Sequence, residues 1–258
     1  MMWLLLLWCA MFPPDRVIDR FPPDRVIDRF PPPPGYHRCV VTPGSYSEWL
    51  GELPLKPKGT PTRTYRGAIA ATNPYTGAVV DMSVGSEDLQ QCADAVMRLR
   101  GEYLYYKRRY KDIAFTFTSG FRCDYLHYAQ GYRFRAGRWV LAAAPDYTYK
   151  TFMQYMRLVF MYCGTLSLEK ELQPVKDART LQAGDIFIHG GSPGHCFIVL
   201  EAVENDKGQR LLLLAQSFMP AQNIQIVQVS GNPWFGADGG APALPYGELI
   251  QLSYAKRF

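Results

Sequence analysis

Apolar positions in the second quarter of the chain repeat first at strand spacing and then at helix spacing. Residues 78–84 alternate in the manner of a strand, and residues 86–106 place leucine, valine, alanine and cysteine on one stripe of a helix. Residues 112–119 alternate again. The pattern therefore predicts a strand, a long helix capped by Ser86 and a second strand, in the order of a β-α-β unit.

The second half of the chain changes from helical patterns to strands. Apolar side chains recur at helical spacing over 147–163, and a short helix is expected at 167–172. Apolar runs separated by glycine-rich or polar turns then predict antiparallel strands at 185–188, 196–203, 210–217 and 224–229. The predicted fold class is α+β in a single domain, with the β-α-β unit and helices before a C-terminal antiparallel sheet.

Two segments precede the predicted domain, which is expected over 35–258. Residues 1–12 form an apolar run too short to cross a bilayer as a helix but about as long as a signal-peptide core. A proline-rich segment follows at 13–34, built around a tandem copy of FPPDRVIDR, and we interpret it as a tether because proline lacks a backbone donor. The leader indicates export to the periplasm or cell envelope, with no transmembrane helix in the mature chain, and leaves a lipid anchor at Cys9 open.

Composition narrows the classes of function. A chain of 258 residues with 48% hydrophobic side chains buries one sizeable core. The net charge of +5 is mild and the basic residues are scattered, which does not favour a nucleic-acid partner. The six cysteines form no CxxC and no Cys/His pair at zinc-ligand spacing, so no metal site is predicted. The glycines of 190–194 lack the Lys-Ser/Thr of a phosphate loop, and no cofactor is expected.

The segment 181–203, LQAGDIFIHGGSPGHCFIVLEAV, is the strongest candidate for chemistry. A Gly-Asp turn leads into a short apolar strand, and after a loop His195 opens a second apolar strand. This pattern resembles papain-like amidases and peptidases of the NlpC type, in which a histidine on the sheet is the general base for a cysteine at a helix N-terminus. The resemblance implies that His195 is the base and that the fold is papain-like.

Hairpin geometry suggests a partner for that histidine. A turn centred within 204–209 places position 218 roughly opposite His195, so that Gln216 becomes its diagonal neighbour on the same face of the sheet. The side-chain carbonyl of Gln216 would then hold the imidazole in one tautomer. A slip of one residue would put Ser217 in this position instead.

Two cysteines are candidates for the nucleophile, because a thiol is most acidic at the N-terminus of a helix. Cys92 lies in the first two turns of the helix predicted from Ser86, and Gln90 and Gln91 precede it as candidate oxyanion donors. Cys123 follows a strand and also lies where a helix could start. Either cysteine could instead be a small buried hydrophobe of the core.

A wider resemblance covers 35–258. The strings GSYSEWLGELPLKPKGTP, DLQQCADAVMRLRGEYLY, FTSGF, YMRLVFMYCGTLSLEKEL, GDIFIHGGSPGHCFIVLEAVEN and LLLAQSFMPAQNIQI, in this order, resemble one bacterial family of exported or lipid-anchored proteins known only as a domain of unknown function. The family's QCADA resembles residues 91–95, whereas its position for Cys123 is commonly not a cysteine. The resemblance therefore favours Cys92 as the nucleophile. It implies no established activity.

The leading hypothesis is a papain-like cysteine hydrolase, an amidase or peptidase acting on cell-wall or envelope peptide. Its catalytic residues would be Cys92, His195 and Gln216, with Gln91 as the oxyanion donor. The alternative is a non-catalytic envelope protein that binds a glycan or peptide, and a third interpretation is a structural partner-binding domain. Candidate binding residues are Trp49, Arg122, Tyr132 and Ser217, with Tyr125 and Trp234 as further walls of an aromatic groove.

Overall fold

The computed structural model describes residues 24–258, so the expected leader and the first part of the expected tether lie outside the described residues. The helices are α2 Val26–Arg29, α3 Tyr46–Gly51, α4 Cys92–Tyr106, α5 Tyr125–Ala129, α6 Tyr149–Tyr162 and α7 Thr165–Glu171. The strands are β1 Tyr36–Arg38, β2 Thr76–Val79, β3 Ala114–Thr116, β4 Arg122–Asp124, β5 Tyr132–Arg135, β6 Arg138–Leu141, β7 Gln173–Pro174, β8 Ile186–His189, β9 His195–Asn205, β10 Arg210–Gln216, β11 Gln225–Val227, β12 Trp234–Phe235 and β13 Ala255–Arg257. None of the helices in 24–258 has the length and apolar character needed to span a membrane.

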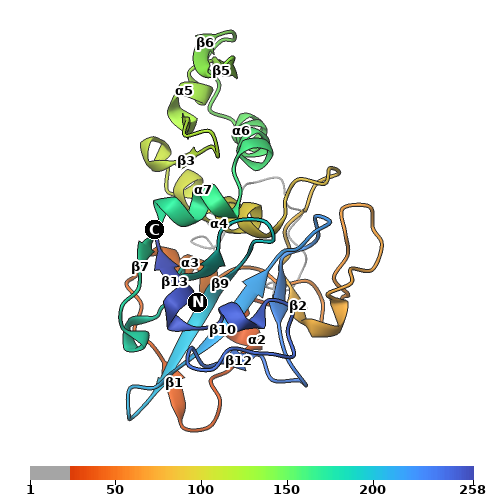
Figure 1. The fold of residues 1–258 in the computed structure, drawn as a ribbon, viewed down its shortest axis with the longest axis vertical. Helices are drawn as coiled ribbons and strands as arrows, with labels where there is room; N and C mark the ends of the chain where they lie inside the picture. Colours follow the sequence, from red (N-terminus) through yellow and green to blue (C-terminus); the bar gives the residue numbers. More distant parts are fainter. Residues whose placement is uncertain (1–23) are drawn as a thin grey trace, which may run out of the picture.

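Nine strands form one antiparallel sheet in the order β2-β11-β10-β9-β8-β13-β7, with β1 paired to β9 and β12 paired to β10 (Figure 1). This arrangement confirms the predicted α+β class and its C-terminal antiparallel sheet. The strand, helix and strand of the predicted β-α-β order are β2, α4 and β3. However, β2 belongs to the large sheet and β3 pairs with β4 in a separate sheet, so these two strands are not neighbours.

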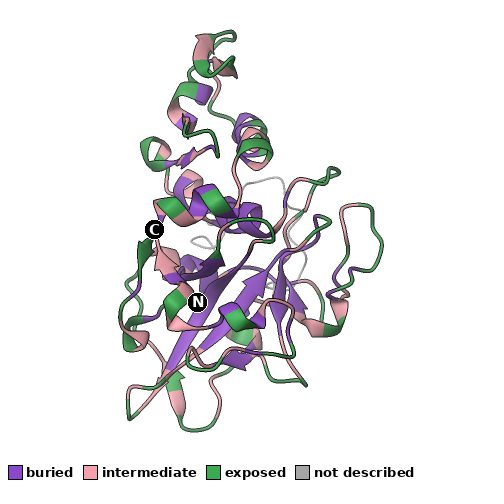
Figure 2. Cartoon of the chain, in the orientation of Figure 1, coloured by how far each residue is buried: buried purple, intermediate pink, exposed green. Residues whose placement is uncertain are grey.

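Both faces of the large sheet are buried along its central strands β8, β9, β10 and β11, which are mostly purple in Figure 2. One face packs against α3 and α4. The other face is covered by residues 237–254, which contribute apolar side chains such as Leu244 and Ile250. Burial on both faces explains why β9 is an almost continuous apolar run rather than an alternating one. The two layers fix β9 at the centre of the molecule.

An arm of α5, the β5–β6 hairpin and α6 projects from the sheet at the top of Figure 1. Its interior is aromatic: Phe152 stacks on Tyr105 of α4 with ring centroids 4.5 Å apart. The ring of Tyr125 meets the ring of Phe152 edge to face. This packing fixes the arm to the helix that starts at Cys92.

Folded structure begins before the expected boundary at Gly35. Residues 26–29 of the expected tether form α2, in which the Val26 N–H donates to the Leu53 carbonyl over 3.1 Å. The side chains of Val26 and Phe30 are buried in the core. Proline constrains the neighbouring residues, but no proline lies between positions 24 and 30, so this part of the second nonapeptide copy is free to form a helical turn.

Helix α4 begins at Cys92 rather than near Ser86. The carboxylate of Asp94 accepts a hydrogen bond of 3.0 Å from the Gln91 N–H, and the first bond within the helix runs from the Ala95 N–H to the Gln91 carbonyl. The cap is therefore made by the side chain of Asp94, three residues after the N-cap, and not by Ser86 as the sequence pattern predicted. As a result, Cys92 is the first residue of the helix.

The β9–β10 hairpin has a register that changes along its length. Near the turn Arg210 lies opposite Glu204, but beyond Leu200, which has no partner in β10, Leu214 lies opposite Val199. The turn is therefore centred half a residue later in the chain than the sequence analysis expected. The bulge at Leu200 compensates for this shift, so that the strand pairing beyond it, toward His195, has the expected register.

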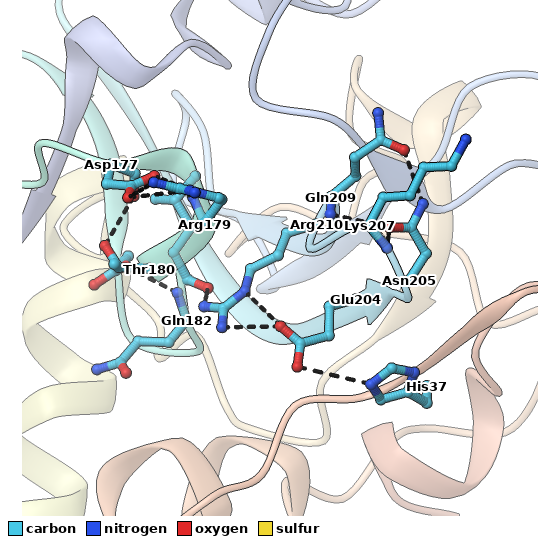
Figure 3. A network of polar contacts seen from close by, with 12 residues as sticks. His37, Asp177, Arg179, Thr180, Gln182, Glu204, Asn205, Lys207, Gln209 and Arg210 are labelled. Atoms are coloured by element: carbon cyan, nitrogen blue, oxygen red, sulfur yellow. Dashed lines mark hydrogen bonds and ion pairs between the residues drawn. The ribbon is translucent and has the colours of Figure 1, made fainter.

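Polar contacts hold the turn end of this hairpin, as Figure 3 shows. The guanidinium of Arg210 donates to Glu204 over 3.1 Å and also to the carbonyl of Leu181. The turn itself is closed by Asn205, whose side-chain oxygen accepts from the Gln209 N–H over 3.0 Å. These contacts fix the register on the turn side of Leu200, where Arg210 lies opposite Glu204.

Candidate active site

Cys92 lies at the wall of a cleft of about 280 Å³. The cleft is bordered by the first turn of α4, by the junction of α6 and α7, by the loop 191–194 and by Met219. The loop approaches α7 closely, since a Cβ on Gly194 would lie only 2.4 Å from the hydroxyl oxygen of Thr165. Cys92 is 8% exposed and forms part of the cleft surface.

His195 and Gln216 form a buried polar contact beside Cys92. The ring Nε2 of His195 and the side-chain Oε1 of Gln216 are 2.7 Å apart, and both residues are buried. Since a carbonyl oxygen accepts and cannot donate, Nε2 carries the proton, and in the neutral ring Nδ1 is left as an acceptor. The imidazole plane is stacked on Tyr246 and contacted by Phe218, with centroid distances of 4.8 and 5.1 Å. These contacts leave the ring little rotational freedom.

The surroundings of Cys92 favour its thiolate. A hydrogen bond with the Cys196 thiol has the largest effect, and a hydrogen bond with His195, the charge of His195 and the Ala93 N–H act in the same direction. Together they lower the pKa of Cys92 below its usual range, although burial opposes them. The position of Cys92 at the start of α4 adds the unpaired N–H groups of the first helical turn. Cys92 and His195 are therefore brought together in a form suited to nucleophilic chemistry.

Ser217 does not hydrogen-bond to His195, which is the role that a slipped register would have given it. Its hydroxyl oxygen lies 3.0 Å from the Gln90 carbonyl and 2.9 Å from the Gln222 carbonyl. It faces the segment that leads into α4, whereas Gln216 contacts His195. Of the two possible registers, the structure has the one that pairs Gln216 with the histidine. Ser217 anchors the residue two positions before Cys92.

The two glutamines before Cys92 point in different directions. The side-chain amide of Gln91 donates to Asp88 over 3.2 Å, and Gln91 borders the cleft. The side chain of Gln90 is buried, and its oxygen accepts from Arg98 over 3.2 Å. Gln91 is thus at the cleft but bonded to a carboxylate, while Gln90 is bonded to Arg98, which also donates to Tyr149 of α6.

Cys123, the other candidate nucleophile, is a core residue of β4. It is fully buried opposite Phe115, and its carbonyl accepts from the Tyr155 hydroxyl over 2.9 Å. Burial raises the pKa of the Cys123 thiol. Its surroundings therefore oppose the thiolate, in contrast to those of Cys92.

The residues expected to form an aromatic groove are not gathered in one place. Trp49, Tyr125 and Trp234 are buried in the core, where hydrophobic packing uses their ring faces. Tyr132 is half-buried in β5 beside His127, and Arg122 is exposed in β4. A groove walled by these side chains is therefore not formed, because large aromatic rings contribute more free energy when they are buried.

Two residues of the site were not identified from the sequence. Cys196 is fully buried and interacts with Cys92, and its position next to His195 in the chain was the signal that could have identified it. Asp94 borders the cleft, its Oδ1 lacks a hydrogen-bond partner within residues 24–258, and burial raises its pKa well above the usual range. Across these same residues no group of three or more histidine, cysteine or carboxylate side chains is arranged to hold a metal ion.

Comparisons with known proteins give one match. A family model described as "Domain of unknown function (4846)" matches residues 26–246, a span that runs from α2 to the tyrosine stacked on His195. The span includes Cys92, His195 and Gln216. No curated protein matches the chain, and no solved structure matches it.

Proposed function

We infer that this chain, which belongs to the family described as domain of unknown function 4846, is a cysteine hydrolase that cleaves amide bonds. The observation that carries the proposal is the arrangement around His195. Its Nε2 is bonded to Gln216 over 2.7 Å, and its ring interacts with a cysteine at the first position of a helix. A nucleophile, a base and a residue that orients the base are the parts such a reaction requires.

The proposed reaction uses these groups in sequence. His195 holds the proton of Cys92, and the thiolate attacks the carbonyl carbon of the substrate amide. The backbone N–H groups at the start of α4 donate to the oxyanion, with the side chain of Gln91 at the same rim of the cleft. His195 then protonates the leaving amine, and a water molecule activated by His195 hydrolyses the thioester and releases Cys92.

The cleft supports a peptide as substrate. Its lining residues include the carboxylate of Asp88 and the carboxyl group of Asp94, whose raised pKa favours its neutral form, and no lysine, arginine or histidine. Such a surface favours neutral or cationic peptide segments over acidic ones. Together with the leader-like residues 1–12, this indicates a peptide of the cell wall or envelope, with the protein exported to that compartment.

The test is release of peptide fragments from purified cell wall and from a panel of fluorogenic peptide amides. We expect turnover by the full chain and a loss of about 10³-fold or more in Cys92→Ala and in His195→Ala. Cys123→Ala is the matched control, since it removes a buried thiol elsewhere and should retain turnover.

Two results would contradict the proposal. The first is turnover that survives Cys92→Ala. The second is binding of the same peptides, equal for the full chain and Cys92→Ala, without any cleavage. That second result would indicate the non-catalytic binding protein instead.

A further inference from the structure

Cys92 and Cys196 are in contact at the point where α4 meets the sheet. Helix α4 packs on β9, and the two thiols share a side-chain hydrogen bond. Cys196 is the second residue of β9, and its backbone is held by pairing with Ile188 of β8. Both cysteines are free thiols in the structure. Cys92 borders the cleft, whereas Cys196 is fully buried behind it.

We propose that Cys92 and Cys196 form a modification site at which a hydroperoxide is reduced and the two thiols are joined in a disulfide. Cys92 is the attacking thiol because it reaches the cleft, and Cys196 is the resolving thiol because it touches Cys92 from the buried side. The inference rests on the contact between the two sulfurs and not on the proposed hydrolysis, so the two proposals can fail separately.

The chemistry balances in two steps. The Cys92 thiolate attacks the terminal oxygen of the hydroperoxide, the O–O bond breaks, and the products are a sulfenic acid on Cys92 and an alkoxide or hydroxide that takes up a proton. The Cys196 sulfur then attacks the Cys92 sulfur. The sulfenic OH leaves with the Cys196 proton as water, and the S–S bond forms. Overall the two thiols lose two electrons and the peroxide gains them.

The surroundings of Cys92 suit the first step. A thiol reacts with peroxide as its thiolate, and the hydrogen bonds from Cys196 and His195 lower the pKa of Cys92. Cleft access is required only at Cys92, because a small hydroperoxide does not need to reach the buried partner.

Cys163 is the other thiol at the cleft, and the structure distinguishes it from Cys196. Its sulfur donates to the Thr116 carbonyl over 3.4 Å, and burial raises the pKa of its thiol. The largest effect on the pKa of Cys92 comes from Cys196, whereas Cys163 is not among the groups that shift this pKa. Cys196 is therefore the resolving thiol.

The experiment maps the oxidised bond directly. The reduced full chain is treated with one equivalent of hydrogen peroxide, blocked with N-ethylmaleimide, digested with trypsin without reductant and measured by mass spectrometry. Lysine and arginine residues place the five cysteines of residues 24–258 on five different tryptic peptides. We expect one cross-linked pair, joining the peptides of Cys92 and Cys196, and its loss on treatment with dithiothreitol.

Matched variants decide the assignment. Cys163→Ala and Cys123→Ala should keep the cross-link, and Cys196→Ala should lose it and leave Cys92 as its sulfenic acid, the product of one equivalent of peroxide. A cross-link from Cys92 to Cys163, oxidation of Cys92 without any cross-link in the full chain, or a Cys92 that stays reduced would each overturn the proposal. The mapping in the full chain and in Cys163→Ala does not depend on whether Cys196→Ala folds.

Discussion

The Nε2 of His195 lies 2.7 Å from the Oε1 of Gln216, and neither side chain is more than 2% exposed. The two residues belong to neighbouring strands, so the orientation of the ring depends on the register of the β9–β10 hairpin. A buried contact of this kind sets which ring nitrogen carries the proton without any change on substrate binding. The imidazole is ready to accept a proton on the side opposite Gln216.

Removing the glutamine side chain tests this orientation. We expect Gln216→Ala to lower kcat/KM for amide hydrolysis by about 10- to 100-fold, the kinetic equivalent of the roughly 1–3 kcal/mol that a buried hydrogen bond contributes. KM should change little, because Gln216 does not border the cleft. The measurement is steady-state hydrolysis of a peptide amide over a range of pH.

The control for that variant is Gln209→Ala, which shortens a glutamine at the turn end of the same hairpin. It should leave kcat/KM and its pH profile unchanged. If both variants behave alike, or if Gln216→Ala raises KM alone, then Gln216 does not orient the histidine.

The ionisation of Cys92 predicts how its alkylation depends on pH. An ordinary thiol with a pKa of about 8.5 is only roughly 0.3% ionised at pH 6. Because the pKa of Cys92 is lowered, the rate of its reaction with iodoacetamide should fall by less than about tenfold between pH 8.5 and pH 6. Cys123, whose pKa is raised, should stay unlabelled. In His195→Ala the inflection should move to higher pH, and an unchanged inflection would mean that His195 does not stabilise the thiolate.

Asp94 predicts a contribution to stability that depends on pH. Its pKa is raised in the folded state, so above the unfolded pKa near 4 the folded chain holds a proton that the unfolded chain has lost. Stability from this group is therefore complete below that pH and decreases as the pH rises toward the folded pKa. Asn in its place keeps an acceptor for the Gln91 N–H and removes the titration.

We therefore expect Asp94→Asn to stabilise the protein relative to the native sequence, and the gain should grow from pH 5 to pH 8. Urea unfolding at several pH values measures it. Comparison at each pH removes the contribution of Cys92, whose lowered pKa acts in the opposite direction. A gain that does not vary with pH would show that Asp94 titrates alike in both states.

Val26 tests whether the second nonapeptide copy belongs to the folded domain. The side chain is fully buried, so Val26→Ala should lower the free energy of unfolding by about 1–3 kcal/mol. Val40→Ala is the matched control, because Val40 is fully exposed and should change stability by less than about 0.5 kcal/mol. Equal stabilities of the two variants would exclude a structural role for α2.

The sequence predicted most of the elements that carry the site, because each has its own local signal. The C-terminal strands follow from apolar runs between turns, and the helix at 147–163 follows from its helical spacing. Gln216 was placed beside His195 by counting residues across a hairpin, and the structure has that register at the site end.

The features of the site that the sequence did not predict depend on contacts between residues far apart in the chain. Whether α4 starts at Ser86 or Cys92 is decided by the carboxylate of Asp94, together with the bond from Ser217 to Gln90. The contact of Cys92 with Cys196 joins a helix to a strand more than a hundred positions away, so no local pattern records it. The prediction of an aromatic groove was wrong for a similar reason, since the burial of Trp49, Tyr125 and Trp234 depends on the whole packed structure.

The unpaired Leu200 separates the length of the hairpin turn from the geometry of the site. On the turn side of Leu200 the paired positions are offset by one residue relative to the site side. If the segment between the two strands were one residue shorter, the strands could pair along their whole length in the register found at the site end. The bulge at Leu200 would then disappear, and neither His195 nor Gln216 would move. Variation in the length of this turn among relatives is therefore compatible with one fixed arrangement of the histidine and the glutamine.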